Sequence, residues 1–454
     1  FSRKRLSVVV RQPDGRELLV CKGAVEDVLS VCTLAQDGAE KVPLTANLRR
    51  DVFTLARRLN EKGMRVLAVA YGEIKQRKRR YSPEDEHDLV LVGFLGFLDP
   101  PKETAASAIA GLKRLGVEVK VLTGDNEVVA RAICEHVGIP VRRALTGAQV
   151  EKMSDEELRE RLRSASVLAK LTPLQKARVV RLLQDLGKTV GFMGDGINDA
   201  AALRAADVGI SVDTAVDIAR ESADIILLEK SLDVLERGIL EGRKVFANIT
   251  KYIKITTSSN FGNVFSILAA SAFLPFLPMA PLQLLFLSLV YNLSCLFLPF
   301  DRVDKEFVER PQQWETGSLV RFILHLGPVS SVYDVATFLV MFFVFGASTV
   351  THQGLFQAGW FIESMATQSL VIHMLRTGRI PFIQSRAALP VLLASAGAIA
   401  IACAVPFTAL GRAMGMLAPP AGYWPVVVGI LVAYLLHAQL VKWAYRRRFG
   451  GEWL

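Results

Sequence analysis

The feature that most constrains this chain is a long stretch without charge. From Thr256 to Phe300 the sequence has no Lys, Arg, Asp or Glu. A helix needs about 20 apolar residues to cross a bilayer, so this stretch is long enough for more than one crossing. Charge is concentrated before it, since residues 1–255 hold 42 of the 54 basic and 36 of the 44 acidic side chains. The pattern predicts a soluble first half and a second half embedded in a lipid bilayer.

Six apolar segments are expected to form membrane helices, at residues 256–276, 282–300, 319–346, 356–375, 389–407 and 423–444. The loops at 301–318 and 376–386 and the tail at 442–448 carry three, three and four Lys or Arg. The loops on the other side carry only Arg412. By the positive-inside rule, the soluble half and the C-terminus are expected to be cytoplasmic.

The soluble half is expected to contain two kinds of fold. Residues 1–87 mix strand-like runs at 6–10, 18–21 and 66–71 with a helix at 48–62, which indicates a small α+β unit. Residues 88–240 alternate short apolar runs with amphipathic helices, which is typical of an α/β parallel sheet flanked by helices. The expected strands are 89–95, 117–122, 167–170, 189–193, 208–210 and 225–228. Ligands bind beyond the carboxyl ends of such strands, so chemistry is expected in the loops that follow them.

The composition and the first residues of the chain limit the partners, metal sites and chain type that are expected. The net charge of +10 includes no basic stripe interleaved with aromatic residues, so no nucleic-acid partner is expected. The five cysteines show no CxxC spacing, which argues against a zinc site or a disulfide framework. The chain starts at Phe1 inside a β-like apolar run, without an initiator Met or a signal peptide, and is therefore expected to be a fragment.

The most specific motif is Gly194-Asp195-Gly196-Ile197-Asn198-Asp199, which lies between an expected strand and an expected helix. Two carboxylates four residues apart in a glycine-permitted turn can hold Mg²⁺ through oxygen ligands, while backbone N–H groups face an anion. A glycine-rich turn alone is often only a tight loop. The presence of Asn198 and Asp199 favours the functional interpretation.

A second motif, Thr123-Gly124-Asp125, follows the expected strand at 117–122 and opens a helix. Its hydroxyl, backbone N–H groups and helix dipole are suited to receive phosphoryl oxygens, although Thr123 or Asp125 could also be an ordinary helix cap. Lys176, at the start of the helix after Pro173, could supply a compensating positive charge. Taken alone, Lys176 would be interpreted as a surface lysine.

Four motifs in this order, ahead of the apolar spans, resemble the C-terminal part of a P-type cation-transporting ATPase. They are Lys22-Gly23-Ala24, Asp99-Pro100-Pro101, Thr123-Gly124-Asp125 and Gly194-Asp195-Gly196-Ile197-Asn198-Asp199. The resemblance implies a nucleotide-binding domain at 1–87, a haloacid-dehalogenase-like phosphorylation domain at 88–240, and a stalk with six transmembrane helices at 241–454. It also implies ATP hydrolysis through an aspartyl phosphate while a cation crosses the membrane.

The resemblance assigns roles to individual residues. Lys22, Arg65 and, more weakly, Lys4 would contact ATP. Thr123, Gly124 and Asp125 would hold the phosphoryl group or nucleotide, and Lys176 would neutralise its charge. Asp195 would bind the catalytic Mg²⁺, with Asn198 and Asp199 completing the pocket. Asp99-Pro100-Pro101 resembles the family's hinge between the two cytoplasmic domains, where proline restricts the backbone before it.

One family signature is missing from this sequence: Asp-Lys-Thr-Gly-Thr, which carries the phosphorylated aspartate. The actuator domain and the first four spans of the family are missing as well. The chain alone is therefore expected not to turn over, because its nucleophile would lie in the N-terminal part of the same pump.

Polar residues inside membrane spans are costly, so each is a candidate for the cation path. The candidates are Asn260, Asn263, Ser288, Asn292, Asp334 and Glu363. Hydrogen bonding between packed helices is the alternative interpretation for the Asn and Ser residues. Buried carboxylates are harder to explain by packing alone.

The spans are similar to the bacterial magnesium-transporting branch of the family, with near matches at 259–265, 273–278, 360–363 and 380–385. The resemblance implies a magnesium importer of the inner membrane. That branch has Asn and Asp where this chain has Ser288 and Asn292. Losing a carboxylate weakens attraction for a hard divalent cation, so a pump for another cation is one alternative. A truncated, non-catalytic remnant that binds nucleotide or a partner is the other.

Overall fold

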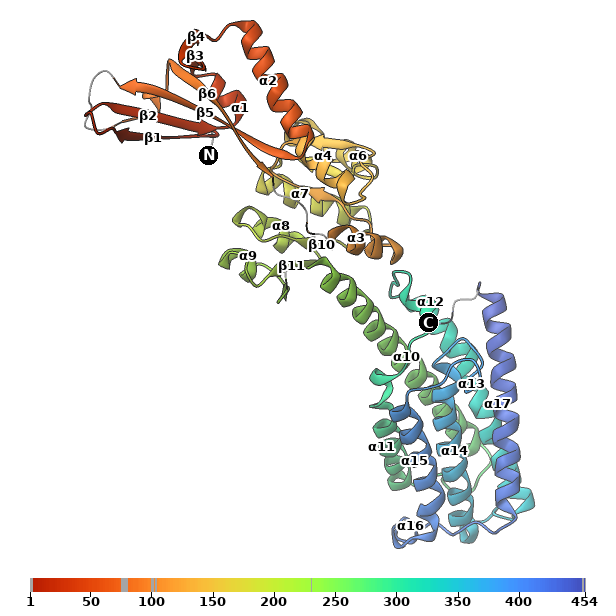
Figure 1. The fold of residues 1–454 in the computed structure, drawn as a ribbon. Helices are drawn as coiled ribbons and strands as arrows, with labels where there is room; N and C mark the ends of the chain where they lie inside the picture. Colours follow the sequence, from red (N-terminus) through yellow and green to blue (C-terminus); the bar gives the residue numbers. More distant parts are fainter. Residues whose placement is uncertain are drawn as a thin grey trace. The chain divides into compact units, whose positions relative to one another are not determined.

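The computed structural model describes residues 3–74, 81–98, 102, 104–229, 231–450 and 453, and Figure 1 traces them by colour. The chain forms two compact units, Phe1–Glu236 and Arg237–Leu454. Helix α10 (Leu232–Ser271) crosses the boundary between them. The expected hinge, Asp99-Pro100-Pro101, lies outside the described residues. The division of the first unit at residue 87 remains a prediction.

The first unit begins with a six-stranded mixed sheet in the order β1-β2-β5-β6-β3-β4. Its strands are β1 (Arg5–Arg11), β2 (Glu17–Gly23), β3 (Cys32–Asp37), β4 (Glu40–Pro43), β5 (Met64–Ile74) and β6 (Leu89–Leu98). Strand β6 pairs antiparallel with β5 and parallel with β3. The expectation that residues 89–95 belong to the parallel sheet was therefore wrong. Consecutive strands tend to pair with one another, and here β6 extends the sheet that β5 already forms.

One face of this sheet is covered by α1 (Val25–Leu29) and α2 (Ala46–Glu61). The core between them includes Cys21 on β2, Ala68 and Ala70 on β5, and Val28 on α1, all fully buried. The small side chains of Ala68 and Ala70 leave room for the helices to pack closely against β5. On the other face, apolar side chains of β1 such as Val8 remain exposed.

The N-terminal strand is fixed by one buried carboxylate, that of Glu86. Its oxygens accept hydrogen bonds from Arg3 Nη1 (2.8 Å), Arg5 Nε (2.7 Å) and Ser7 Oγ (2.9 Å). Burial by itself would raise the pKa of Glu86, but these donors outweigh it and hold the pKa below its ordinary value. Glu86 therefore ties β1 to the segment that precedes β6.

The rest of the first unit has the expected alternation of parallel strands and helices. Its strands form two three-stranded parallel sheets, in the orders β7-β9-β8 and β10-β11-β12, where one sheet was expected. The strands are β7 (Val121–Leu122), β8 (Ala144–Thr146), β9 (Val167–Ala169), β10 (Gly191–Met193), β11 (Val208–Val212) and β12 (Ile225–Leu227). The helices are α3 (Ala105–Arg114), α4 (Glu127–His136), α5 (Gly147–Lys152), α6 (Asp155–Leu162), α7 (Pro173–Asp185), α8 (Ala200–Ala205) and α9 (Asp217–Glu221).

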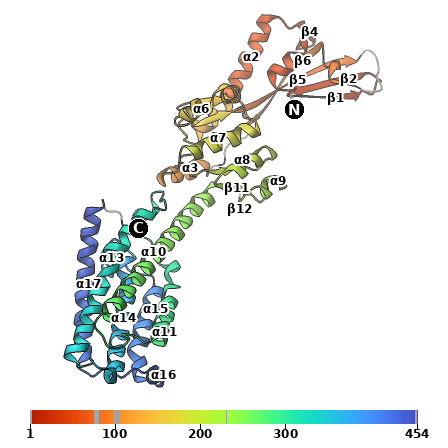
Figure 2. The same ribbon diagram turned by 180° about the vertical axis from the view of Figure 1, so that it is seen from behind.

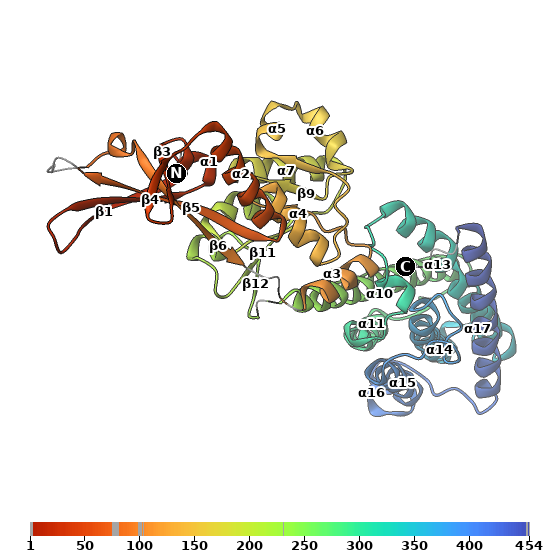
Figure 3. The ribbon, with the colours of Figure 1, turned by 45° about the horizontal axis from the view of Figure 1, so that its top comes forward.

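The second unit is a bundle of helices, seen from two further sides in Figures 2 and 3. Besides α10 it contains α11 (Pro281–Cys295), α12 (Lys305–Val308), α13 (Thr316–Leu339), α14 (Gln353–Leu375), α15 (Leu389–Ala404), α16 (Ala409–Ala413) and α17 (Tyr423–Arg448). Among the residues that the structure describes, four segments are long and apolar enough to cross a membrane: Pro281–Phe300, Thr316–Val344, Leu389–Phe407 and Tyr423–Arg448. The other two expected spans, 256–276 and 356–375, fall on α10 and α14. A total of six crossings remains a prediction.

Helix α14 lies at the centre of this unit, in contact with α11, α13, α15 and α17. Nearly all of its side chains are buried, including Glu363, Gln368 and His373. Because neighbouring helices shield these polar residues, α14 can tolerate a composition that a lipid-facing helix could not. The polar residues also explain why α14 is less apolar than the four spans named above.

The role of Glu86 can be tested by Glu86→Gln in the full chain. The amide cannot satisfy the two guanidinium groups as the carboxylate does, so we expect the first unit to lose about 2 kcal/mol of stability. Hydrogen exchange of the β1 amides at pH 7 measures the effect. The stability from an acid whose folded pKa is lowered is present above the unfolded pKa of about 4.3 and is lost as pH falls further. The difference between parent and variant should therefore shrink below that pH, and a constant difference would contradict this assignment.

Candidate functional site

The motif at 194–199 forms a tight turn between β10 and α8. The backbone N–H of Gly194 bonds the carbonyl of Ile210 on the neighbouring strand (3.1 Å). A Cβ atom at Gly194 would lie 2.5 Å from the Cβ of Asp199, so this position requires glycine. The N–H of Gly196 donates to Asp199 Oδ2 (3.2 Å). The turn thus folds Asp199 back over its own backbone, while Asp195 and Asn198 are exposed at the strand end.

Lys176 lies beside this turn and is buried. Its Nζ donates to Asp199 Oδ1 at 2.7 Å, with only 10% of the lysine side chain and 14% of the aspartate side chain exposed. Lys176 occupies the first turn of α7, which begins with Pro173 and is capped by Thr172 and Gln175. The alternative that Lys176 is a surface lysine is therefore wrong. A lysine so placed provides a fixed positive charge at the edge of the sheet.

The motif at 123–125 forms a second turn, after β7. The N–H of Asp125 bonds Thr123 Oγ1 (3.0 Å), and this hydroxyl lies 3.1 Å from Asp125 Oδ2. The side chain that caps α4 is Asn126, whose Oδ1 accepts from the N–H of Val128 (3.0 Å). The alternative in which Thr123 or Asp125 caps this helix is therefore wrong. Neither side chain is occupied by helix capping.

The two turns lie at neighbouring places in the unit. The carbonyl of Thr123 accepts from the N–H of Leu171, just before α7 (3.0 Å). Leu122 packs against the cluster of Val180 on α7 and Phe192 on β10. Helix α7 therefore borders both turns, and its Lys176 is bonded to Asp199 of the turn at 194–199. This packing supports a common pocket for the predicted residues.

Arg65 connects the six-stranded sheet to this region. Its guanidinium forms an ion pair with the carboxylate of Asp125. Lys22 and Lys4 lie elsewhere. Lys22 is paired in the β ladder with Leu6 on β1 and Val69 on β5, and Lys4 directly precedes β1, where its carbonyl accepts from the N–H of Ala24. Of the three predicted nucleotide contacts, the structure therefore places only Arg65 at the motif of Thr123.

Close packing of the backbone explains the glycine in the Lys22-Gly23-Ala24 motif. A Cβ atom at Gly23 would lie 2.5 Å from the carbonyl oxygen of Lys4, so only glycine allows β1 and β2 to approach so closely. The N–H of Ala24 bonds that same carbonyl (3.0 Å). Lys22 and Lys4 are consequently exposed near each other at one corner of the sheet.

The acids at the first turn suit a hard cation. Mg²⁺ keeps several water ligands and is held by one or two carboxylates together with substrate phosphate. Asp195 and Asp199 supply two carboxylates of this kind. No group of three or more His, Cys, Asp or Glu that could enclose a metal occurs in the described part of the chain. The site thus fits an ion that arrives with a phosphate ligand better than one held by protein alone.

The membrane unit contains a second polar centre, at Asp334 on α13. Ser266 Oγ on α10 donates to Asp334 Oδ2 (2.7 Å), and Trp360 Nε1 on α14 donates to Asp334 Oδ1 (2.7 Å). Asp334 is only 2% exposed. Three helices therefore meet on one carboxylate, and both of its oxygens accept a hydrogen bond.

Glu363 lies one helical turn from Trp360 on α14 and is fully buried. Among the described residues, no donor lies in hydrogen-bonding geometry with either of its carboxylate oxygens, and its side chain lies beside those of Asp334 and Thr367. Buried hydroxyls in the same condition are those of Ser258, Ser259, Tyr291, Thr337 and Ser369. Buried polar groups without partners are costly, so the buried carboxylate of Glu363 is the group in the bundle best suited to receive a ligand.

The remaining cation candidates are less enclosed. Asn263 on α10 accepts from Gln368 Nε2 on α14 (3.3 Å), as the packing alternative predicts. Asn260, Ser288 and Asn292 are exposed on the surfaces of α10 and α11. The structure therefore brings together Asp334 and Glu363 but leaves these three on an open face of the unit.

Three residues of these centres were missed from the sequence: Ser266, Trp360 and Gln368. Spacing could have revealed Ser266, because it follows Ser259 by seven residues and Asn263 by three and so shares their helix face. Trp360 precedes Glu363 by three residues and could have been assigned to the same face. Nothing in the local sequence pairs either residue with Asp334 on another helix.

Comparisons with known families match three successive regions of the chain. Residues 1–104 match the P-type ATPase cytoplasmic domain N, residues 72–207 the haloacid dehalogenase-like hydrolases, and residues 276–444 the C-terminus of cation-transporting ATPases. These matches follow the order of the two sheet regions and the helical bundle.

Individual relatives match the whole chain. Magnesium-transporting ATPases, P-type 1, from Salmonella typhimurium and from Escherichia coli are each 50% identical over 452 residues, covering 100% of this chain and 50% of the relative. A calcium-transporting ATPase 1 from Lactococcus lactis is 30% identical over 339 residues, covering 73% of this chain and 39% of the relative. The chain thus spans about half the length of the curated relatives it matches.

The polar centre at Asp334 can be tested by Trp360→Phe. This change removes one hydrogen bond to a buried carboxylate, so we expect a loss of about 2 kcal/mol of stability, measured by thermal unfolding in detergent. Trp443→Phe is the matched control, because Trp443 is 58% exposed on α17. Equal effects of the two changes would show that the bond to Asp334 contributes little.

Proposed function

We propose that this chain, which belongs to the P-type cation-transporting ATPases, is the C-terminal half of an ATP-driven magnesium pump. The observation that carries the proposal is the 50% identity to magnesium-transporting ATPases over the full length of the chain. The pump would lie in the bacterial inner membrane, with the first unit and the C-terminus in the cytoplasm. The basic loops and tail support this orientation.

In this proposal the two turns around α7 receive the phosphoryl group. Thr123 and Asp125 would orient it, and Lys176 would offset its negative charge from a fixed position beside Asp199. Asp195 and Asp199 would hold Mg²⁺, which when bound neutralises charge on the phosphate oxygens. The phosphorylated aspartate would come from a segment outside this sequence, since no Asp-Lys-Thr-Gly-Thr occurs in it.

Arg65, Lys22 and Lys4 are the proposed nucleotide contacts. Arg65 forms an ion pair with Asp125, so ATP binding near Thr123 would have to compete with this pair or rearrange it. Lys22 and Lys4 lie together at the end of the β1–β2 pair that is opposite the turn joining the two strands. Their separation from Arg65 along the ladder suits an extended ligand such as a nucleoside triphosphate.

The transported cation is proposed to pass near Asp334 and Glu363. Glu363 offers two oxygens without partners, whereas Asp334 already accepts bonds from Ser266 and Trp360. Glu363 is therefore the stronger candidate ligand. Asn260, Ser288 and Asn292 would contribute neutral oxygens from exposed faces of α10 and α11, and Asn263 would do so only by exchanging its bond with Gln368.

Transport can be tested by joining this chain to the N-terminal half of the Salmonella relative and reconstituting the product in vesicles. We expect ATP-dependent accumulation of Mg²⁺. Uptake of another divalent cation alone would contradict the assigned ion, and uptake of none would contradict the function. Vesicles without ATP supply the baseline.

The phosphoryl site can be tested by Asp195→Asn in the same joined protein. We expect Mg²⁺-dependent phosphorylation from ATP to fall at least tenfold, because the amide is a poorer ligand for a hard cation. Asp185→Asn is the control, since Asp185 is an exposed acid at the end of α7. Labelled ATP and acid-quenched gels measure the phosphoprotein. An undiminished phosphoprotein with Asp195→Asn would remove Asp195 from the site.

A further inference from the structure

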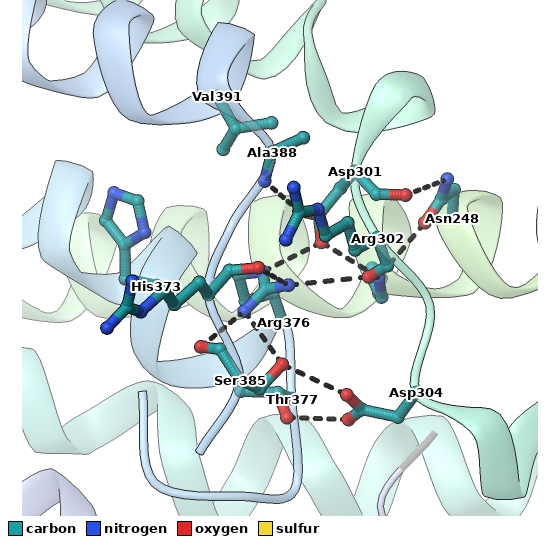
Figure 4. A network of polar contacts seen from close by, with 12 residues as sticks. Asn248, Asp301, Arg302, Asp304, His373, Arg376, Thr377, Ser385, Ala388 and Val391 are labelled. Carbon is teal, nitrogen blue, oxygen red and sulfur yellow. Dashed lines mark hydrogen bonds and ion pairs between the residues drawn. The ribbon is translucent and has the colours of Figure 1, made fainter. Parts of the chain in front are cut away.

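A buried charged network lies at one end of the helical bundle, away from the membrane residues discussed above. At its centre is Asp301, which follows the last residue of the span at 281–300 and has a fully buried side chain. Figure 4 shows that groups from several segments converge on this residue. Neither the phosphoryl site nor the cation path uses it.

Two cations share one oxygen of Asp301. Lys251 Nζ on α10 lies 2.9 Å from Oδ2, and Arg376 Nε, just after α14, lies 2.8 Å from the same oxygen. Only 1% of either cationic side chain is exposed. Oδ1 accepts from the N–H of Ala388, the cap residue of α15 (3.1 Å). One carboxylate therefore binds α10 and the adjoining ends of α14 and α15.

The partners of Asp301 are themselves held by further bonds. Lys251 also donates to Asn248 Oδ1 (3.1 Å) and to the carbonyl of Arg302 (2.7 Å), which uses all three of its protons. Asn248 Nδ2 donates to the carbonyl of Asp301 (3.1 Å). Arg376 Nη1 donates to the carbonyl of Ser385 (3.1 Å). Such a network permits little local freedom, because every shift would strand a buried charge.

The charge state of Asp301 agrees with this geometry. Burial by itself would raise the pKa of Asp301, but Lys251 and Arg376 more than compensate and hold it below the ordinary value. Asp301 is thus ionised at neutral pH. Its neighbour Asp304 differs in its partners, which are two hydroxyls: Thr377 Oγ1 donates to Oδ2 (2.6 Å) and Ser385 Oγ donates to Oδ1 (3.0 Å). An asparagine there can accept from one hydroxyl and donate to the other.

Stability alone is a weak explanation for a buried ion network. Removing charges from water is costly, and apolar residues of similar size often stabilise a fold equally well. Each bond of an ion network restricts both the distance and the angle between its members, so the network can fix their relative position. The relevant member is Lys251, because α10 begins in the first unit and ends in the bundle.

We propose that Asp301 is a positioning residue that links α10 to α11, α14 and α15, so that displacement of α10 during the ATP cycle moves the helices carrying the cation site. This inference rests on the proposed function, because it assigns a role within the pump. The three connections of Asp301 to Lys251, Arg376 and Ala388 provide the link. The Asp304 side chain accepts its hydrogen bonds from Thr377 and Ser385, which lie outside α10.

The test uses the chain joined to the N-terminal half of the Salmonella relative. Asp301→Asn alone leaves two buried cations without a counter-ion and can simply fail to fold. The double change Asp301→Asn with Lys251→Met removes one of those cations and cuts the link to α10. Asp304→Asn in the same loop is the matched control. Thermal unfolding, ATP hydrolysis and Mg²⁺ uptake are measured for each protein.

We expect the double variant to unfold near the parent's temperature and to hydrolyse ATP, but to move roughly tenfold less Mg²⁺ per ATP. Asp304→Asn should match the parent in all three measurements. A double variant with the parent's uptake per ATP would overturn the proposal and leave Asp301 a purely structural residue. Failure of the parent itself to transport would instead contradict the proposed function.

A second measurement on the 454-residue chain in detergent does not depend on transport. Hydrogen exchange should be roughly tenfold faster in the double variant at residues 386–392, around the amide of Ala388 that bonds Asp301. The same peptide in Asp304→Asn should exchange at the parent's rate. Unchanged exchange in the double variant would show that Asp301 does not hold the start of α15, and would overturn the proposal even if the parent failed to transport.

Discussion

The cost of burying charge without a partner governs how the second unit of this protein is arranged. Within its helices, Asp334 accepts two hydrogen bonds from neighbouring helices, and at one end Asp301 binds two cations and an amide. Glu363 is the exception, since neither of its oxygens has a partner among the described residues. The carboxylates of Asp334 and Asp301 both accept hydrogen bonds on both oxygens. A buried carboxylate that lacks such bonds indicates a place where a ligand can bind.

Much of this arrangement could be predicted from local sequence. The charge-free stretch indicated the membrane half, and the glycine-rich turn at 194–199 indicated a site at a strand end. Glycine is required at Gly194 because Asp199 folds back against it, so the motif reflects a steric requirement as well as membership of a family. The family resemblance is confirmed by matches over three successive regions.

Other features could not be predicted because they depend on contacts between distant segments. The strand at residues 89–98 looks like any short apolar run, and only its pairing with β5 and β3 assigns it to the first sheet. Lys176 has the sequence surroundings of a surface residue, yet the fold of α7 buries it against Asp199. Trp360, Ser266 and Asp334 lie on three different helices, so no spacing along the chain could bring them together.

The proposed pump requires that phosphorylation at the two turns around α7 change how a cation is bound between the helices of the second unit. The most direct test of that claim is growth of a bacterial strain lacking its own magnesium uptake systems, supplied with the joined protein at limiting Mg²⁺. The account predicts that growth is restored by the parent and not by a form altered at the acids of the first turn. Absence of growth, with the protein present in the membrane and able to hydrolyse ATP, would contradict it.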